Sequence, residues 1–279
     1  MPPRRLRLDQ ELVRRGLARS RDHASSLVAD GRVKVKGVLA TKPATGVTTD
    51  VAIVVREDPD RPEYASRGAH KLVGALDAFA EHGLSVEGKR CLDAGASTGG
   101  FTDVLLQRGA KRVLAVDVGY GQLVWRLQND DRVEVHDRTN VRELSPELVG
   151  EPVDLVVGDL SFISLTLVLD ALLSVTAPDG ELALMVKPQF EVGKDRVGKG
   201  GVVRDLALRA EAVTTVADAA AAKGWGARAV TVSPLPGPSG NVEFFLLLRR
   251  GEPTIGADEI TAEVERTKDL GASAGKAEK

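Results

Sequence analysis

The sequence has few features that would anchor the chain in a membrane or cross-link it covalently. Cys91 is the single cysteine among 279 residues, so no intramolecular disulfide can form, and we expect a reducing, cytoplasmic setting. The first residues are basic, but no continuous apolar stretch follows them, which argues against a secretory signal. The longest apolar region, residues 153–177, is interrupted by Asp154, Asp159 and Asp170, each costly in hydrocarbon, so we expect no membrane segment.

The chain also has almost no net charge, because 38 Lys and Arg residues face 40 Asp and Glu residues. A content of 43% hydrophobic and 28% charged residues is typical of globular proteins and excludes collagen-like, disordered and disulfide-scaffold classes. The balance conceals an asymmetry: residues 1–42 have a net charge of +7, which leaves −9 for the remaining chain. This division predicts a small polyanion-binding module joined to a domain with another task.

Two short helices and a strand are predicted for the basic segment. Apolar residues at helical spacing predict a helix over residues 8–18, and Ser20 is placed to cap a second helix that Gly31 closes. Residues 32–38 alternate between cationic and apolar side chains, which predicts a half-exposed strand with its cations on one face.

The polar run at residues 57–63 contains two prolines and marks a domain boundary. Beyond it, short apolar runs alternate with amphipathic segments, which predicts a doubly wound, Rossmann-like α/β sheet with ligands at the carboxyl ends of its strands. Strands are expected at residues 90–93, 112–117, 133–136, 153–158, 181–186, 227–233 and 242–248, and helices at 102–108, 123–128, 163–173, 206–223 and 260–268. The expected domains are a small α+β module (1–58), a linker (59–65), the α/β domain (66–251) and a polar tail with a short helix (252–279).

A glycine-rich turn follows the first strand of the predicted sheet and precedes a helix. Such a turn lets backbone N–H groups approach a nucleotide-like ligand, although tight strand-to-helix packing also uses glycine. The next strand ends at Asp117, where an acidic group binds the ribose of NAD or of S-adenosylmethionine. The turn lacks the middle glycine of G-x-G-x-x-G and begins with Asp93, whose carboxylate suits a cationic amino group, so S-adenosylmethionine is favoured. Asp137, after the third strand, either binds the adenine of this cofactor or caps a helix. The expected cofactor contacts are Asp93, Gly95, Ser97, Thr98, Gly99, Gly100, Asp117, Val118 and Asp137.

Four polar residues lie at strand ends or motif centres where a structural role would not require them. Asp159 and Lys187 directly follow two apolar strands, so we expect both at the cofactor edge of the sheet. Lys71 belongs to the string Ser-Arg-Gly-Ala-His-Lys, and Glu243 to Gly-Asn-Val-Glu. A surface salt bridge would explain any one of them, but the four in this order are much harder to explain in that way.

The amino-terminal module resembles the RNA-binding domain named after ribosomal protein S4. The resemblance covers most of residues 7–55 and rests on Asp9, Leu12, Gly16-Leu17-Ala18, Ser20-Arg21, Ala24, Gly31, Val33, Val35, Gly37, Lys42 and Pro43. It implies that Arg7, Arg19, Arg21 and Lys42 face structured RNA, and Arg67 in Ser-Arg-Gly is a further candidate; a solvated basic surface is the alternative.

The order Lys71, Asp159, Lys187, Glu243 resembles the Lys-Asp-Lys-Glu tetrad of FtsJ-like RNA ribose 2′-O-methyltransferases. With the strings Asp-Ala-Gly-Ala-Ser-Thr-Gly-Gly-Phe-Thr, Asp-Leu-Ser-Phe-Ile-Ser and Val-Lys-Pro-Gln-Phe-Glu, nearly the whole chain is similar to the TlyA family, whose members are also labelled haemolysins. This resemblance implies methylation of cytidine in ribosomal RNA within ribosomal subunits, with the residues before Leu8 and the tail helix suggesting both 16S and 23S substrates. It implies no obligate protein partner. Some close relatives carry Arg-x-Trp-Val where this chain has Pro62-Glu63-Tyr64-Ala65, which puts in doubt any coupling between RNA docking and cofactor binding through that tryptophan.

The chemistry follows from the weak nucleophilicity of a ribose 2′-hydroxyl, which needs a base and alignment with the sulfonium methyl. We expect Lys187 to accept the proton as a neutral amine, favoured by partial burial and by the cation Lys71, while Asp159 and Glu243 orient the amines. No metal is expected, because the sulfonium is already activated. Three alternatives stay open: an NAD-dependent oxidoreductase, a ribosome assembly factor without catalysis, and a membrane-active haemolysin, for which the sequence offers no physical mechanism. We expect RNA affinity to lie mostly in residues 1–55 and to fall with salt.

Overall fold

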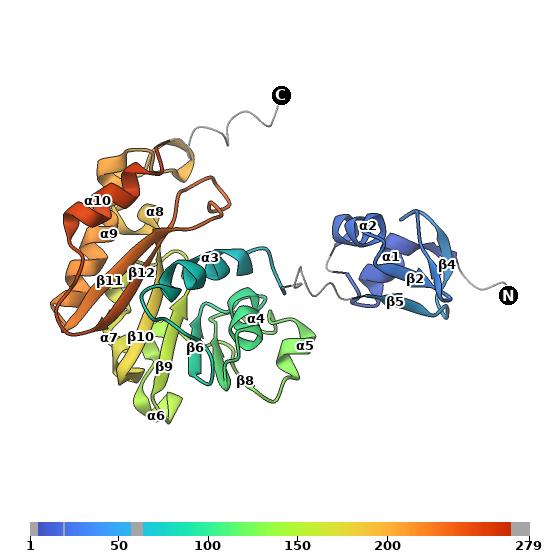
Figure 1. The fold of residues 1–279 in the computed structure, drawn as a ribbon, viewed down its shortest axis with the longest axis horizontal. Coiled ribbons are helices and arrows are strands. Elements are labelled where there is room, and N and C mark those ends of the chain that lie inside the picture. Colours follow the sequence, from blue (N-terminus) through green and yellow to red (C-terminus); the bar gives the residue numbers. More distant parts are fainter. Residues whose placement is uncertain (1–4, 19, 57–63, 269–279) are drawn as a thin grey trace. The chain divides into compact units, whose positions relative to one another are not determined.

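The structure is a computed structural model of the 279-residue chain, and it describes residues 5–18, 20–56 and 64–268. The chain divides into two compact units, the first ending at Glu63 and the second beginning at Tyr64 (Figure 1), and each is described by itself. The polar run at 57–63, Arg19 and the tail beyond Lys268 lie outside the described residues.

The first unit packs two helices and two small antiparallel sheets around one core. The core includes Leu8, Leu12, Leu27, Val33 and Val47, so both helices and both sheets contribute to it. The sheets have the strand orders β1-β4 and β3-β2-β5. The elements are β1 (Arg5–Arg7), α1 (Leu8–Arg14), α2 (Arg21–Ala29), β2 (Val33–Val35), β3 (Val38–Leu39), β4 (Gly46–Thr48) and β5 (Ile53–Val55).

The cap at Ser20 is confirmed, but the first helix is shorter than predicted. The Ser20 side chain accepts a hydrogen bond from the backbone N–H of His23. Helix α1 ends at Arg14 because Gly16 adopts a left-handed φ of 70°, and the N–H groups of Gly16 and Leu17 return to the carbonyls of Val13 and Leu12. This is the Schellman pattern, which ends a helix, so the apolar spacing beyond Arg14 does not continue it.

The second unit is built on a seven-stranded sheet that contains all seven predicted strands. Its order is β11-β12-β10-β9-β6-β7-β8, and only β12 runs antiparallel to its neighbours. The strands are β6 (Arg90–Ala94), β7 (Arg112–Val116), β8 (Val133–His136), β9 (Val153–Gly158), β10 (Thr176–Val186), β11 (Trp225–Val232) and β12 (Phe244–Arg250). The helices are α3 (Ala69–Ala80), α4 (Gly100–Gln107), α5 (Trp125–Gln128), α6 (Pro146–Val149), α7 (Leu169–Val175), α8 (Pro188–Glu191), α9 (Leu206–Ala221) and α10 (Ala257–Glu265), with 3₁₀ turns at Val141–Glu143, Leu165–Leu167, Lys194–Arg196 and Lys199–Gly201.

The predicted helix over residues 163–173 is wrong in its first half. Ser164 caps a 3₁₀ turn by accepting a hydrogen bond from Thr166 N, and the Glu191 carboxylate accepts another from Leu165 N. Side-chain partners therefore begin a tighter turn here, and the α-helix starts only at Leu169.

Helices cover both faces of the sheet, as Figure 1 shows. One core lies between the sheet and helices α7, α9 and α10, and includes Leu92, Val156 and Leu184. The other lies between the sheet and helices α3 and α4, and includes Val157 and Met185. Alternate residues of one strand thus enter different cores, which confirms the doubly wound α/β prediction.

Candidate functional site

Five polar residues at strand ends are directed to the same face of the large sheet. Residues two positions apart in a strand point to the same side, and Val157 and Met185, two positions before Asp159 and Lys187, belong to the core under α3 and α4. The same alternation holds for the others. The five residues are Asp93, Asp117, Asp159, Lys187 and Glu243.

Lys187 is held by two acceptors from the loop that follows β9. Its Nζ lies 2.6 Å from Asp159 Oδ1 and donates a hydrogen bond to Ser161 Oγ at 2.8 Å. A lysine amine has three hydrogen positions when protonated, and when neutral one of them is a lone pair. Ser161 accepts one of these hydrogen bonds, whereas Asp159 Oδ1 pairs with the amine by charge and has no hydrogen-bond partner within the described residues, so Nζ keeps a direction for a further group.

Lys71 forms the second ion pair of the site, from helix α3. Its Nζ lies 2.5 Å from Glu243 Oε2, and the two side chains are 10% and 1% exposed. Met185 Sδ lies 4.0 Å from the same Nζ. Within the described part of the chain, Glu243 Oε1 is buried without a hydrogen-bond partner. A buried pair of this kind is costly to break from one side, because it leaves an uncompensated charge.

The two ion pairs lie at the ends of three adjacent strands. In the sheet, Gly158 of β9 pairs with Leu184 of β10, and Val186 of β10 pairs with Phe244 of β12. Asp159, Lys187 and Glu243 therefore continue neighbouring strands at one edge, and α3 adds Lys71 there. The structure thus brings together the four residues that the sequence singles out, as a group of two lysines and two carboxylates, while their catalytic roles stay a prediction.

The glycine-rich turn forms part of the wall of a pocket of about 110 Å³ beside Asp159. Gly95 has a left-handed φ of 86°, and a Cβ added there would lie 3.0 Å from the Asp159 carbonyl oxygen. A Cβ at Gly100 would lie 2.3 Å from Ser66 Oγ. The turn thus needs glycine both for its conformation and for close packing. The pocket is lined by Ser66, Gly68, Gly95, Ala96, Ser97, Thr98, Gly100, Phe101 and Asp159, and Gly99 belongs to the same turn.

Asp93 is fully buried at the start of this turn. Burial raises the pKa of its carboxyl to about 7, although hydrogen bonding from Thr102 opposes the rise, and the nearby Asp159 and Asp117 add to it. Thr102 Oγ1 donates to Oδ2 at 2.7 Å, whereas Oδ1 has no hydrogen-bond partner within the described ranges. An unpartnered buried acceptor beside exposed Ser97 and Thr98 fits a cofactor with a cationic amino group and a hydrogen-bonding ribose.

Asp117 and Asp137 both hold the loop after β7. Asp117 accepts hydrogen bonds from Ser97 N at 2.8 Å and Gly119 N at 2.7 Å, so it links this loop to the glycine turn. Asp137 accepts from Gly121 N at 2.8 Å. The helix-cap alternative for Asp137 is wrong, since the next turn is capped by Asn140. Both carboxylates keep free lone pairs, and Val118 between them is 69% exposed.

The first residues of the second unit pack against the helix of the glycine turn. The Ala65 N–H donates to Asp103 Oδ2 at 2.7 Å, and Ser66 lines the pocket. The Tyr64 ring meets His70 edge-on at 5.6 Å between centroids. This chain thus has a packed aromatic side chain, that of Tyr64, in the segment that departs from the Arg-x-Trp-Val pattern. Pro62 and Glu63 lie outside the described residues.

Sequence reasoning did not single out Ser161 or the aromatic residues beside it. Phe162 is 91% exposed with a left-handed φ of 64°, and its ring lies 5.3 Å from that of Phe190. The sequence feature that could have indicated them is the string Asp-Leu-Ser-Phe-Ile-Ser, which directly follows a buried strand and places polar and aromatic residues where the strand end meets solvent. An exposed aromatic in the left-handed region is unfavourable for folding and is typical of functional loops.

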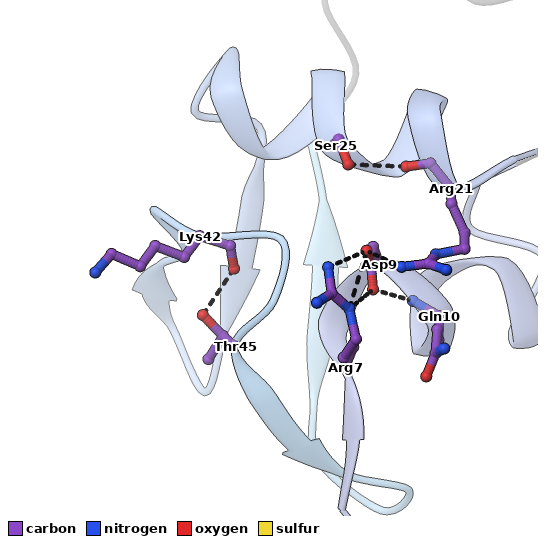
Figure 2. A network of polar contacts seen from close by, with 7 residues as sticks. All are labelled: Arg7, Asp9, Gln10, Arg21, Ser25, Lys42 and Thr45. Carbon is purple, nitrogen blue, oxygen red and sulfur yellow. Dashed lines mark hydrogen bonds and ion pairs between the residues drawn. The ribbon is translucent and has the colours of Figure 1, made fainter.

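The predicted RNA-facing arginines of the first unit are organised around a buried carboxylate (Figure 2). Asp9 accepts from Arg7 Nη2 at 2.8 Å and from Arg21 Nη2 at 3.2 Å, which lowers the pKa of the Asp9 carboxyl to about 2, mainly through Arg7. The side chains of Arg7 and Arg21 are still 46% and 56% exposed. Lys42 points away from this cluster into solvent, Arg67 is exposed in the second unit, and Arg19 lies outside the described residues.

Residues 5–18, 20–56 and 64–268 lack the features of two further classes of site. No helix there is long and apolar enough to cross a membrane. The same residues hold no cluster of three or more His, Cys, Asp and Glu side chains suited to a metal ion.

Comparison with known proteins assigns families to both units. The FtsJ-like methyltransferase family matches residues 64–250, and the S4 domain matches residues 6–53. A Mycobacterium tuberculosis protein named 16S/23S rRNA (cytidine-2′-O)-methyltransferase TlyA is 60% identical over 88% of this chain and 90% of its own length. A Campylobacter jejuni protein named 23S rRNA (cytidine-2′-O)-methyltransferase TlyA is 37% identical over 65% of this chain and 69% of its own. The solved structure of a Streptococcus thermophilus protein called a hemolysin covers 97% of this chain and 98% of its own, with 34% identity and a TM-score of 0.70.

Proposed function

Because this chain belongs to the TlyA family of FtsJ-like methyltransferases with an amino-terminal S4 domain, we propose that it methylates the ribose 2′-hydroxyl of cytidine in ribosomal RNA, with S-adenosylmethionine as the methyl donor. The observation that carries the proposal is the arrangement of two lysine–carboxylate pairs beside the glycine turn. Membership in a methyltransferase family also makes the NAD-dependent oxidoreductase alternative wrong.

The cofactor, when bound, supplies an electrophilic methyl group on its sulfonium. Lys187 Nζ accepts the proton of the 2′-hydroxyl as the O–H bond breaks. The bond from oxygen to the methyl carbon forms as the bond from that carbon to sulfur breaks, and the electron pair of the broken bond would stay on sulfur as a neutral thioether. The ion pair with Asp159 and the hydrogen bond to Ser161 Oγ hold Nζ at the end of β10, where the substrate is proposed to bind. Lys71 and Glu243 keep the interior of the site close to electrical neutrality, since each buried charge has an opposite partner.

The cofactor contacts are proposed on the glycine turn and the loops after β7 and β8. Backbone N–H groups at the start of α4 and the unpartnered Oδ1 of Asp93 suit the amino-acid part of the cofactor. Asp117 suits the ribose hydroxyls, and the Asp137 loop suits the adenine. Two of the three carboxylates are already tied to backbone N–H groups, so the loops that they hold are ordered before the ligand arrives.

The RNA substrate is proposed to include both 16S and 23S rRNA, in the form of ribosomal subunits. This finer assignment rests on the name of the M. tuberculosis relative, which is the more similar of the two named methyltransferases and matches along 90% of its length. A 23S-only specificity is the alternative, in line with the name of the C. jejuni relative. Action on rRNA would place the protein in the cytoplasm, where ribosomes are.

The Lys187→Ala variant tests the proposed role of the amine. Transfer of radiolabelled methyl groups from S-adenosylmethionine to unmodified 30S and 50S subunits should fall about 10²- to 10⁴-fold, because a general base contributes a factor of that size. Cofactor affinity measured by calorimetry should change little. The matched control is Lys111→Ala, which removes an exposed lysine at the opposite ends of the parallel strands.

Two results would count against the proposal. Near wild-type methyl transfer by Lys187→Ala, with cofactor binding intact, would remove Lys187 from the mechanism. Binding of subunits by the unaltered protein without any methyl transfer would favour the assembly-factor alternative. Mapping of the methylated nucleotides by reverse-transcription stops then identifies the substrate nucleotide and distinguishes 16S from 23S specificity.

A further inference from the structure

The outer face of the β3-β2-β5 sheet carries cations that the proposed function leaves without a role. Strand β2 is the central strand, with Leu39 of β3 and Val54 of β5 directly opposite Lys34. The alternate residues Val33 and Val35 lie on the inner face, in or against the core that also contains α1 and α2. Lys34 therefore points away from the helices, and so do Arg32 and Arg56, which continue the β2–β5 pairing by one step.

This face is not arranged for stability. Arg56 N donates to the Arg32 carbonyl and Arg32 Nε donates to the Arg56 carbonyl, so two cationic side chains sit opposite each other across the strands. Leu39 and Val54 are 48% and 57% exposed beside Lys34, although burial of both would have stabilised the unit. Cations often protect edge strands against aggregation, but Lys34 lies on the central strand, where no edge needs protection.

The turn at the end of β2 also carries a cation in an unfavourable backbone conformation. Lys36 and Gly37 form the two-residue connection between Val35 and Val38, and both have left-handed φ values, of 51° and 79°. Asn, Asp or Gly normally fills the first position of such a turn, and a lysine there costs about 1–2 kcal/mol. A fourth cation is therefore placed at the tip of this face at some cost to folding.

We propose that this outer sheet face, defined by Arg32, Lys34, Lys36, Arg56 and the flanking Leu39 and Val54, is a second RNA-binding surface. It rests on the proposed function in that the RNA is ribosomal. The cations contact backbone phosphates, and the exposed Leu39 and Val54 contact sugars or unstacked bases. The surface differs from the cluster around Asp9, because that cluster lies where β1 leads into α1 and at the first residue of α2, on the helix side of the unit.

Charge complementarity selects RNA as the occupant. The face combines several cations with two apolar side chains, and among the described residues Asp50 is an acidic neighbour, close to Lys36. Lys34 and Arg56 are thus the better residues to substitute, since Lys36 shares its surroundings with a carboxylate. The acidic second unit of the same chain is the competing occupant, and the experiment is designed to separate the two.

The test measures how affinity for 23S rRNA, transcribed in vitro, depends on salt. Each phosphate contact contributes about 0.7 to 0.9 to the slope of log affinity against log salt concentration. Between 50 and 200 mM salt, the affinity of the unaltered full-length protein should fall by a certain factor. For the Lys34→Ala/Arg56→Ala double variant, the factor by which affinity falls should be about 7 to 12 times smaller. Lys34→Arg should keep the wild-type slope, and Lys111→Ala, the control in the second unit, should keep it as well.

A companion experiment reports where the face lies in the absence of RNA. Acetylation of Lys34 by a lysine-reactive reagent, followed by mass spectrometry, should be fast in the free full-length protein and slow once rRNA is added. Slow acetylation in the free protein, or a wild-type salt slope for the double variant, would overturn the proposal and leave the second unit as the occupant. Neither binding nor labelling requires methyl transfer, so a failure of the proposed enzymatic function would be seen separately.

Discussion

The buried carboxyl of Asp93 predicts a dependence of stability on pH that a single substitution should remove. Its pKa is about 7 in the folded chain and 3.8 for an ordinary aspartate, so between these values the folded chain keeps a proton that the unfolded chain has lost. Stability therefore falls as pH rises through this range, and the loss is complete above pH 7. Two pH units, from 5 to 7, correspond to about 3 kcal/mol at about 1.4 kcal/mol per unit.

The Asp93→Asn variant cannot ionise, yet its side-chain oxygen can still accept the hydrogen bond from Thr102. The free energy of unfolding of this variant, relative to the wild type, should therefore rise by about 3 kcal/mol between pH 5 and pH 8. For a unit of this size, that corresponds to a relative gain in Tm of about 6 to 12 °C. Urea unfolding followed by circular dichroism at half-unit pH steps provides the measurement.

A matched control comes from the donor to the same carboxyl. Thr102→Val removes a hydrogen bond that favours the ionised form, so the pH range over which stability is lost should move above 7. If the stability of Asp93→Asn relative to the wild type stays constant from pH 5 to pH 8, the carboxyl is already ionised at pH 5. The assignment of a raised pKa to burial would then be refuted.

Two further predictions concern the lysines of the site. Glu243→Ala should lower the free energy of unfolding by about 3–5 kcal/mol, because it leaves the Lys71 ammonium buried and unpaired. The Lys71→Ala/Glu243→Ala double variant should lose less stability than the sum of the losses of the two single variants. Additive losses in urea unfolding would show that the two side chains are not coupled. Ser161→Ala should reduce kcat for rRNA about 10- to 100-fold with little change in KM and a displaced pH profile, because it removes the acceptor of a hydrogen bond from an amine that becomes charged as it takes the proton. Ser161→Thr should restore activity, and a change confined to KM would assign Ser161 to RNA binding instead.

The predicted sheet was correct because its signals are local. Each strand is a short apolar run bounded by polar or glycine residues, and all seven occur where the pattern indicates. The insertion of antiparallel β12 between β10 and β11 depends on pairing between distant segments, and no local pattern carries that information. Helix ends were less predictable, because Gly16 and Ser164 decide them through backbone and side-chain partners rather than through apolar spacing.

The site followed the same division between local and distant information. Strand-end positions predicted Asp159 and Lys187 at one edge, since residues after adjacent parallel strands must meet there. The sequence did not indicate that Asp9 would hold Arg7 and Arg21, because Arg21 reaches that carboxylate from a second helix. Ionic partners of this kind depend on how the elements pack.

The surroundings of the two lysines differ in a way that assigns them different tasks. Both side chains are buried to a similar extent, with 8% and 7% of each residue exposed for Lys71 and Lys187. Lys71 contacts Glu243 and Met185, each about 1% exposed. Lys187 instead adjoins the loop that begins at Asp159, which opens to solvent. A nucleotide arriving from solvent would meet this exposed loop beside Lys187, which favours Lys187 as the candidate base and leaves Lys71 to balance the buried charge of Glu243.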